Sequence, residues 1–106
     1  MKISVLKLCA DGSLLKLWIC PSIEEVQLQL GGAVDTVRVF SGVQTFIRRL
    51  PDVHELEENV CFPGIYGDVL FTGGQGSYLA GLSLAQMSSL CKLFRREKAT
   101  NGKARL

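Results

Sequence analysis

The chain has 106 residues, of which 47% are hydrophobic and 21% charged, and its formal net charge is +2. A chain of this length folds as one domain with a single modest core, because two cores would need more buried surface than it can supply. No run approaches the roughly 20 apolar residues of a membrane-spanning helix, so we expect no membrane span and assign no membrane partner. The high apolar content predicts exposed apolar side chains, which favours a partner surface or a homo-oligomer.

The charge is distributed unevenly along the chain. Six basic residues and one acid, Glu97, follow Cys91, which gives this end +5 and leaves −3 for the rest. A basic end can contact nucleic acid, a membrane surface or an acidic protein face, and it can equally be a solvated segment that keeps the protein soluble. Both interpretations stay open.

Four cysteines and one histidine are too widely spaced for a zinc site, since no two cysteines form a CxxC pair. The first apolar run is broken by Lys2 and Lys7 and shows no cleavage site, so we expect no secretory leader. These features predict a cytoplasmic protein with reduced cysteines and no bound metal.

Two β-rich runs, residues 2–9 and 14–20, flank Asp11-Gly12, and Asp-Gly between apolar runs predicts a β-hairpin. We expect Cys9 to pair with Leu14, which places Lys7 opposite Lys16 on a solvated or acid-paired face. The apolar side chains on the core face are then Leu6, Leu8, Leu15, Leu17 and Ile19.

A short helix follows Pro21. Ser22 and Glu25 have the spacing of a capping box, and the helix is expected to end at Leu30, before Gly31-Gly32. Residues 34–40 alternate as a strand, and residues 43–49 form a further strand after Ser41-Gly42.

The middle of the chain is less regular. Residues 52–59 are rich in acids and lack periodicity, which indicates an exposed acidic loop or one poor helical turn. After Phe62-Pro63-Gly64 we expect a strand over residues 65–72, a glycine-rich turn over 73–76 and a last strand over 77–82.

The chain closes with a second helix. Ser83 and Gln86 form a capping box, and Leu82 with Met87 has the spacing of a hydrophobic staple, so the helix should begin at Leu84. Its expected apolar stripe consists of Leu84, Met87, Leu90, Cys91 and Phe94. Residues 98–106 are expected to form a disordered basic tail, which leaves residues 1–97 as the domain.

The elements occur in the order strand, strand, helix, strand, a less certain strand, strand, strand, helix. Hairpins dominate this order, and two helices are available to cover one face. The fold class is therefore α+β, with a mainly antiparallel sheet of four to six strands.

The acidic group in the middle of the chain could imitate the phosphates of a nucleic acid and enter a basic groove on another protein. Its members are Asp52, Glu55, Glu57 and Glu58. A solvated loop is the alternative. The acidic group is the first candidate partner-binding site.

A second group could bind phosphates or bases. Arg48 and Arg49, with Arg38 on the neighbouring strand, could hold phosphates, and Trp18 or Tyr66 could stack a base. Basic residues on the wet face of a sheet are the alternative.

The glycine-rich turn is a candidate for an anion or nucleotide contact, through the backbone N–H groups of Gly73, Gly74 and Gly76. It lacks the Lys-Ser/Thr ending of a P-loop and lies between strands, so a plain hairpin turn is the alternative. A nucleotide pocket here would have to be completed by a neighbouring subunit.

Catalytic residues are scarce. Cys61 with His54 is the only cysteine and histidine combination that could serve as nucleophile and base, and no spacing signature supports it. With one histidine and no metal ligands, the sequence predicts neither an enzyme nor a cofactor.

The chain resembles a family of small uncharacterised proteins encoded by phages and mobile elements of Gram-positive bacteria. The resemblance covers about half the chain: residues 22–34, residues 65–71, and the closing helix from Leu82 to Phe94. Family members usually carry an acidic pair where this chain has Ala85-Gln86, and residues 43–62 do not match clearly. The resemblance implies a phage or plasmid context in a bacterial cell and transfers no site residues.

These observations lead to the hypothesis of a small non-catalytic phage or mobile-element protein that inhibits a host defence component by covering its surface. A CRISPR effector is a suitable target, because its nucleic-acid channel is basic. The alternatives are an oligomeric protein that sequesters a nucleotide signal, and a nucleic-acid-binding accessory protein that uses the basic end.

Overall fold

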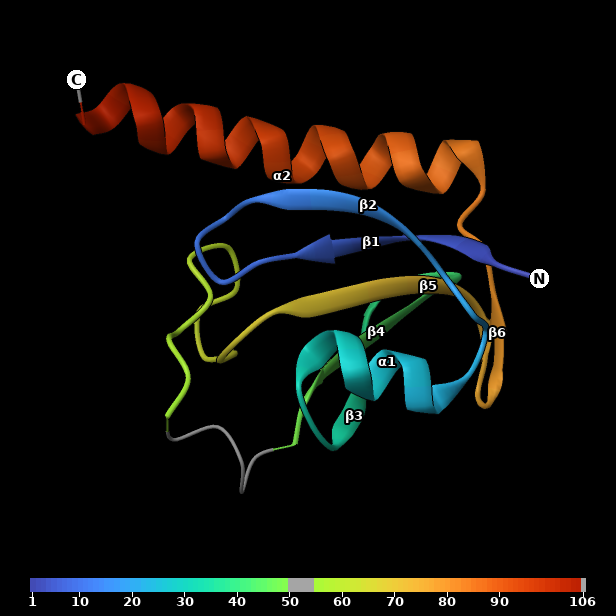
Figure 1. Ribbon diagram of the computed structural model, residues 1–106. Helices are drawn as coiled ribbons and strands as arrows, with labels where there is room; N and C mark the ends of the chain where they lie inside the picture. The colour runs from blue at the N-terminus through green and yellow to red at the C-terminus, as the bar shows by residue number, and fades with distance from the viewer. Residues whose placement is uncertain (50–54, 106) are drawn as a thin grey trace.

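The computed structural model describes residues 1–49 and 55–105, with side chains up to Phe94. Six strands form one sheet in the order β2-β1-β5-β4-β3, with β6 paired to β5, and every pair is antiparallel (Figure 1). This confirms the α+β class and the order of elements. The elements are β1 Ile3–Leu8, β2 Leu14–Ile19, α1 Ile23–Leu30, β3 Val34–Phe40, β4 Val43–Arg48, β5 Val69–Gln75, β6 Tyr78–Ala80 and α2 Leu84–Arg105.

The two helices cover opposite faces of the sheet, and not one face as expected (Figure 1). Val26 and Leu30 of α1 pack in one cluster with Val5, whereas Leu90 and Phe94 of α2 pack in a second cluster. The reason is that the central strands are apolar on both sides: consecutive side chains of a strand point to opposite faces, and both faces of β1 and β5 are buried.

The first hairpin is shifted by one residue from the expected register. Leu8 pairs with Leu14, so Lys7 lies opposite Leu15 and not opposite Lys16. The loop between β1 and β2 therefore includes Cys9 and is one residue longer than expected. The Cys9 amide donates to the Ser13 carbonyl and closes this loop. A shift by one residue exchanges the faces of a strand. The face predicted to be solvated is therefore buried at Ile3 and Val5.

Both helix starts follow their capping residues. The Ser22 hydroxyl accepts the Glu25 amide at 3.2 Å, and α1 ends at Gly31 in the left-handed conformation, with φ 89°. The Ser83 amide donates to Oε1 of Gln86 at 2.8 Å, and the Gln86 amide donates to the Ser83 hydroxyl at 3.1 Å. The Ser83-Gln86 capping box is therefore complete, whereas at Ser22 only the hydroxyl caps the helix, because the Ser22 amide donates to the Cys20 carbonyl.

The apolar stripe of α2 is shorter than expected. Leu84 is 86% exposed, and the contacts with the sheet begin one turn later, at Met87. Side chains lean toward the N-terminus of a helix, so the side chain of the first residue points past the helix start. The backbone of α2 continues to Arg105, beyond the expected end near residue 97.

The strand β5 begins at Val69, four residues later than expected, and includes Gly73 and Gly74. Residues 65–67 are engaged elsewhere: the Ile65 carbonyl accepts the Asn59 amide at 2.8 Å, and the Gly67 amide donates to the Glu57 carbonyl at 2.8 Å. The expected glycine-rich turn is correspondingly shorter and lies between Gln75 and Tyr78.

Candidate partner-binding surfaces

The side chain of Asn59 fixes residues 55–68 to the sheet. It is 1% exposed, and its Nδ2 lies within hydrogen-bond distance of the carbonyls of Leu8, Cys9 and Gly67, at 3.3, 3.4 and 3.0 Å. Its Oδ1 accepts the Cys61 amide at 2.9 Å. The segment from residue 55 to 68 is therefore an ordered structure built around one buried amide, and the sequence offered no periodic signal for it.

Three predicted carboxylates lie on the surface of this segment. Glu55, Glu57 and Glu58 are exposed, and Oε2 of Glu58 accepts the Gly64 amide at 2.7 Å. Glu58 also forms a β-bridge with Tyr66, which is 39% exposed, and Val60 nearby in the chain is 53% exposed. We name residues 55–66 the acidic segment; Asp52 lies outside the described residues.

Arg48 lies at the end of α1. Its Nη1 donates to the Leu30 carbonyl at 3.3 Å, and a side chain at Gly32 would overlap the guanidinium, which a Cβ atom would approach to 2.7 Å. The last carbonyls of a helix lack partners inside the helix, and a cation stabilises them. The geometry gives Arg48 a helix-capping contact.

Arg49 lies beside the outer strand β3. Its Nε is 3.2 Å from Oδ1 of Asp35, and its Nη2 donates to the Val34 carbonyl at 3.3 Å. Arg38 on the same strand is exposed. The Arg48 and Arg49 side chains thus both make structural contacts at the α1 end of β4.

Two of the three glycines of the predicted anion site, Gly73 and Gly74, pack against neighbouring backbone, whereas Gly76 meets open space. A Cβ at Gly73 would lie 2.7 Å from the Gly81 carbonyl, and one at Gly74, where φ is +88°, would overlap the Tyr78 carbonyl. Gln44, at the far end of β4 from Arg48, donates to the carbonyls of Gly73 and Tyr78. The structure therefore separates the glycines from the Arg48-Arg49 pair by the length of β4.

Trp18 lies on β2, an outer strand of the sheet, and is 59% exposed. The Nζ of Lys16 lies 5.5 Å from the centre of the Trp18 ring, and both side chains share the sheet face that α2 covers further inward. Leu15 on the opposite face is 44% exposed. The structure thus has exposed apolar side chains, as predicted, and two of them, Leu15 and Trp18, lie on β2.

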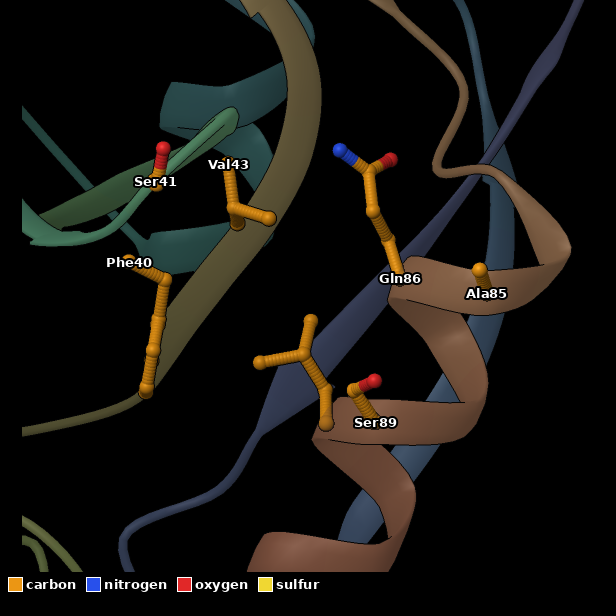
Figure 2. Close-up of a pocket in the computed structure, with 7 residues that line it drawn as sticks. Phe40, Ser41, Val43, Ala85, Gln86 and Ser89 are labelled. Atoms are coloured by element: carbon orange, nitrogen blue, oxygen red, sulfur yellow. The ribbon is translucent and has the colours of Figure 1, made fainter.

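A groove that the sequence did not indicate separates α2 from the turn between β3 and β4 (Figure 2). Its volume is about 240 Å³, and Gln86 crosses it by donating to the Gly42 carbonyl at 2.9 Å. A dry cavity of roughly 150 Å³ already holds benzene, so the groove is large enough for one aromatic side chain. Its lining residues are Phe40, Ser41, Val43, Ala85, Gln86, Ser89 and Leu90.

Catalytic and metal chemistry gain no support from the described residues. Cys61 is half-buried beside the α2 cluster, and His54 lies outside the described residues. Within the described ranges, no three histidine, cysteine, aspartate or glutamate side chains gather to hold a metal ion. None of the described helices is long and apolar enough to cross a bilayer.

Comparison with protein-family models, with curated proteins and with solved structures gives no match to this chain.

Proposed function

We propose that this protein is a non-catalytic binding protein of a phage or mobile element, and that it inhibits a host defence component by covering part of its surface. The acidic segment is the surface that would make this contact. Its target would carry a basic groove, as a CRISPR effector does.

The observation that supports this proposal is the ordered presentation of carboxylates. Asn59 and the backbone hydrogen bonds of residues 57–67 hold the segment, while the carboxylates of Glu55 and Glu57 remain exposed. Binding costs less when the binding groups are already ordered, because less conformational entropy is lost.

The surroundings of the carboxylates also suit a protein partner. Tyr66 and Val60 are exposed within the same segment, and the Glu58-Tyr66 bridge places an aromatic ring next to an acid. Protein interfaces are enriched in tyrosine at their centres and are polar at their rims. An electrostatic contact of this kind would act mainly on the rate of association and on specificity.

The phage or mobile-element context rests on the resemblance of residues 22–34, 65–71 and 82–94 to a family of such proteins. A small inhibitor of this kind would need no active site. The bacterial cytoplasm would be its place of action, because CRISPR effectors act there.

The test is inhibition of target-DNA cleavage by purified CRISPR effectors loaded with guide RNA, with and without the protein. We expect Glu57→Lys to weaken inhibition about tenfold, which corresponds to about 1.4 kcal/mol. Glu24→Lys is the matched control, since Glu24 is an exposed acid on α1 and its reversal changes the net charge equally. Undiminished inhibition by Glu57→Lys, or no inhibition of any effector, would contradict the proposal.

A further inference from the structure

The strands at the two ends of the β2-β1-β5-β4-β3 path, β2 and β3, differ in how they are protected. An outer strand exposes unpaired backbone N–H and C=O groups, and proteins usually block such an edge with charges, bulges or covering segments. On β3 the pairing with β4 shifts register between Val37 and Phe40, and the Arg49 guanidinium donates a hydrogen bond to the Val34 carbonyl. The strand β2 has an unbroken register over all six residues.

The pattern of hydrogen bonds between β1 and β2 shows which residues of β2 direct their backbone N–H and C=O groups away from β1. The Cys9 amide donates to the Ser13 carbonyl, and hydrogen-bonded pairs alternate with non-bonded pairs along an antiparallel ladder. The backbone groups of Leu15 and Leu17 therefore face β1. Those of Lys16 and Trp18 face outward, where no described strand pairs with β2.

An independent contact supports this assignment of bonded and non-bonded pairs between β1 and β2. The Ser4 carbonyl accepts the Leu82 amide at 2.9 Å, on the side of β1 away from β2. Ser4 lies opposite Trp18, so this pair is a non-bonded one, as the alternation requires.

We propose that β2 pairs with β2 of a second copy of this chain, in an antiparallel, two-fold symmetric dimer centred on Leu17. In this arrangement Lys16 of one copy lies opposite the partner's Trp18, and the two residues exchange backbone hydrogen bonds. The symmetry repeats the pair, so four hydrogen bonds form around the axis.

The register follows from side-chain chemistry. Centring on Lys16 would place two ammonium groups opposite each other, which is unfavourable. Centring on Leu17 places each ammonium beside an indole ring, an attractive pairing that Lys16 and Trp18 already show within one chain at 5.5 Å. On the other face, the exposed Leu15 lies opposite the partner's Ile19, so apolar surface is buried on both sides.

The mass in solution tests the dimer. Light scattering at about 100 µM chain should give twice the 11.6 kDa of one chain. Lys16→Pro removes an outward N–H and should yield the single-chain mass. Thr36→Pro is the matched control on the other outer strand, β3. The Arg49 amide donates to the Ala33 carbonyl, so Ala33 and Arg49 form a hydrogen-bonded pair between β3 and β4. Because bonded and non-bonded pairs alternate, the Thr36 N–H points away from β4, as the Lys16 N–H points away from β1. Thr36→Pro should leave the dimer intact.

A second experiment tests the register without relying on proline. In a Cys20→Ser background, Leu17→Cys should form a disulfide between copies, because the two residues meet at the axis, whereas Leu15→Cys should not. A wild-type chain of single mass overturns the proposal. Three other results would also overturn it: a dimer that persists in Lys16→Pro, a dimer that is lost in Thr36→Pro, and Leu17→Cys copies that form no disulfide. These outcomes are separate from inhibition by the acidic segment, which can fail or succeed in either oligomeric state.

Discussion

The Nδ2 of Asn59 donates to the Leu8 carbonyl at 3.3 Å and so ties the acidic segment to a strand 51 residues earlier in the chain. The same side chain reaches the Gly67 carbonyl and the Cys61 amide. One buried amide thereby connects β1 to the middle and the C-terminal end of the segment that we propose as the binding surface.

Replacing this amide should destabilise the whole protein. Asn59→Ala leaves buried carbonyls and an amide without a partner, which costs about 3 kcal/mol of the free energy of unfolding. Urea denaturation followed by tryptophan fluorescence measures this, since Trp18 is the single tryptophan. Gln75→Ala, at an exposed position, is the control and should stay within about 0.5 kcal/mol of wild type. An equally small effect of Asn59→Ala would mean that the segment is not held by this side chain.

Two buried threonines should respond in opposite directions to replacement by valine. The Thr45 hydroxyl has no hydrogen-bond partner among the described residues, whereas the Thr72 hydroxyl donates to the Gly73 carbonyl at 2.9 Å. Thr45→Val should raise the free energy of unfolding by about 1 kcal/mol, and Thr72→Val should lower it by a similar amount. Both residues are at most 1% exposed, so each serves as the control for the other. A loss of stability in Thr45→Val would show that its hydroxyl has a partner.

The glycines of the hairpin between β5 and β6 should differ in their tolerance of alanine. Gly74→Ala combines a positive φ with an overlap on the Tyr78 carbonyl and should cost about 3 kcal/mol or more. Gly76→Ala meets open space at φ +61° and should cost about 1 kcal/mol. Thermal denaturation of both variants measures the difference.

The same variants test the alternative of nucleotide binding. If the hairpin only closes a turn, a panel of nucleotides should not shift the denaturation midpoint of the wild type. A ligand at 100 times its dissociation constant would add about 2.7 kcal/mol. Such a shift in wild type that disappeared in Gly76→Ala would support an anion site at this hairpin.

Gln86 has two separable roles. Its Oε1 completes the capping box with Ser83, and its Nε2 bridges the groove to the Gly42 carbonyl. Gln86→Ala removes both contacts and should cost about 1.5 kcal/mol, whereas Gln86→Glu keeps the capping acceptor and should cost less. Chemical denaturation of the two variants separates the contributions. Equal losses would indicate that the cap contributes nothing.

Local signals in the sequence were sufficient for several elements. Ser22, Ser83 and Gly31 mark helix ends because their contacts are with residues a few positions away. Phe40 and Val43 similarly bound the strands β3 and β4, which alternation and the intervening Ser41-Gly42 predicted. The candidate acids Glu55, Glu57 and Glu58 are exposed, as a stretch without apolar periodicity suggested.

Other features depended on distant parts of the chain. The role of Asn59 rests on Leu8, and those of Arg48 and Arg49 rest on Leu30, Val34 and Asp35. No spacing between neighbours in sequence could indicate these contacts, because their partners lie between 14 and 51 residues away in the chain.

The helix starts, most of the strands and the α+β class follow from local patterns, because capping, alternation and turn chemistry act over a few residues. The start of β5, the hairpin register, the opposite placement of α1 and α2 and the outer position of β2 follow from contacts between distant residues. The last three of these are set by burying two apolar faces of one sheet at once, and that balance sums contacts from the whole chain.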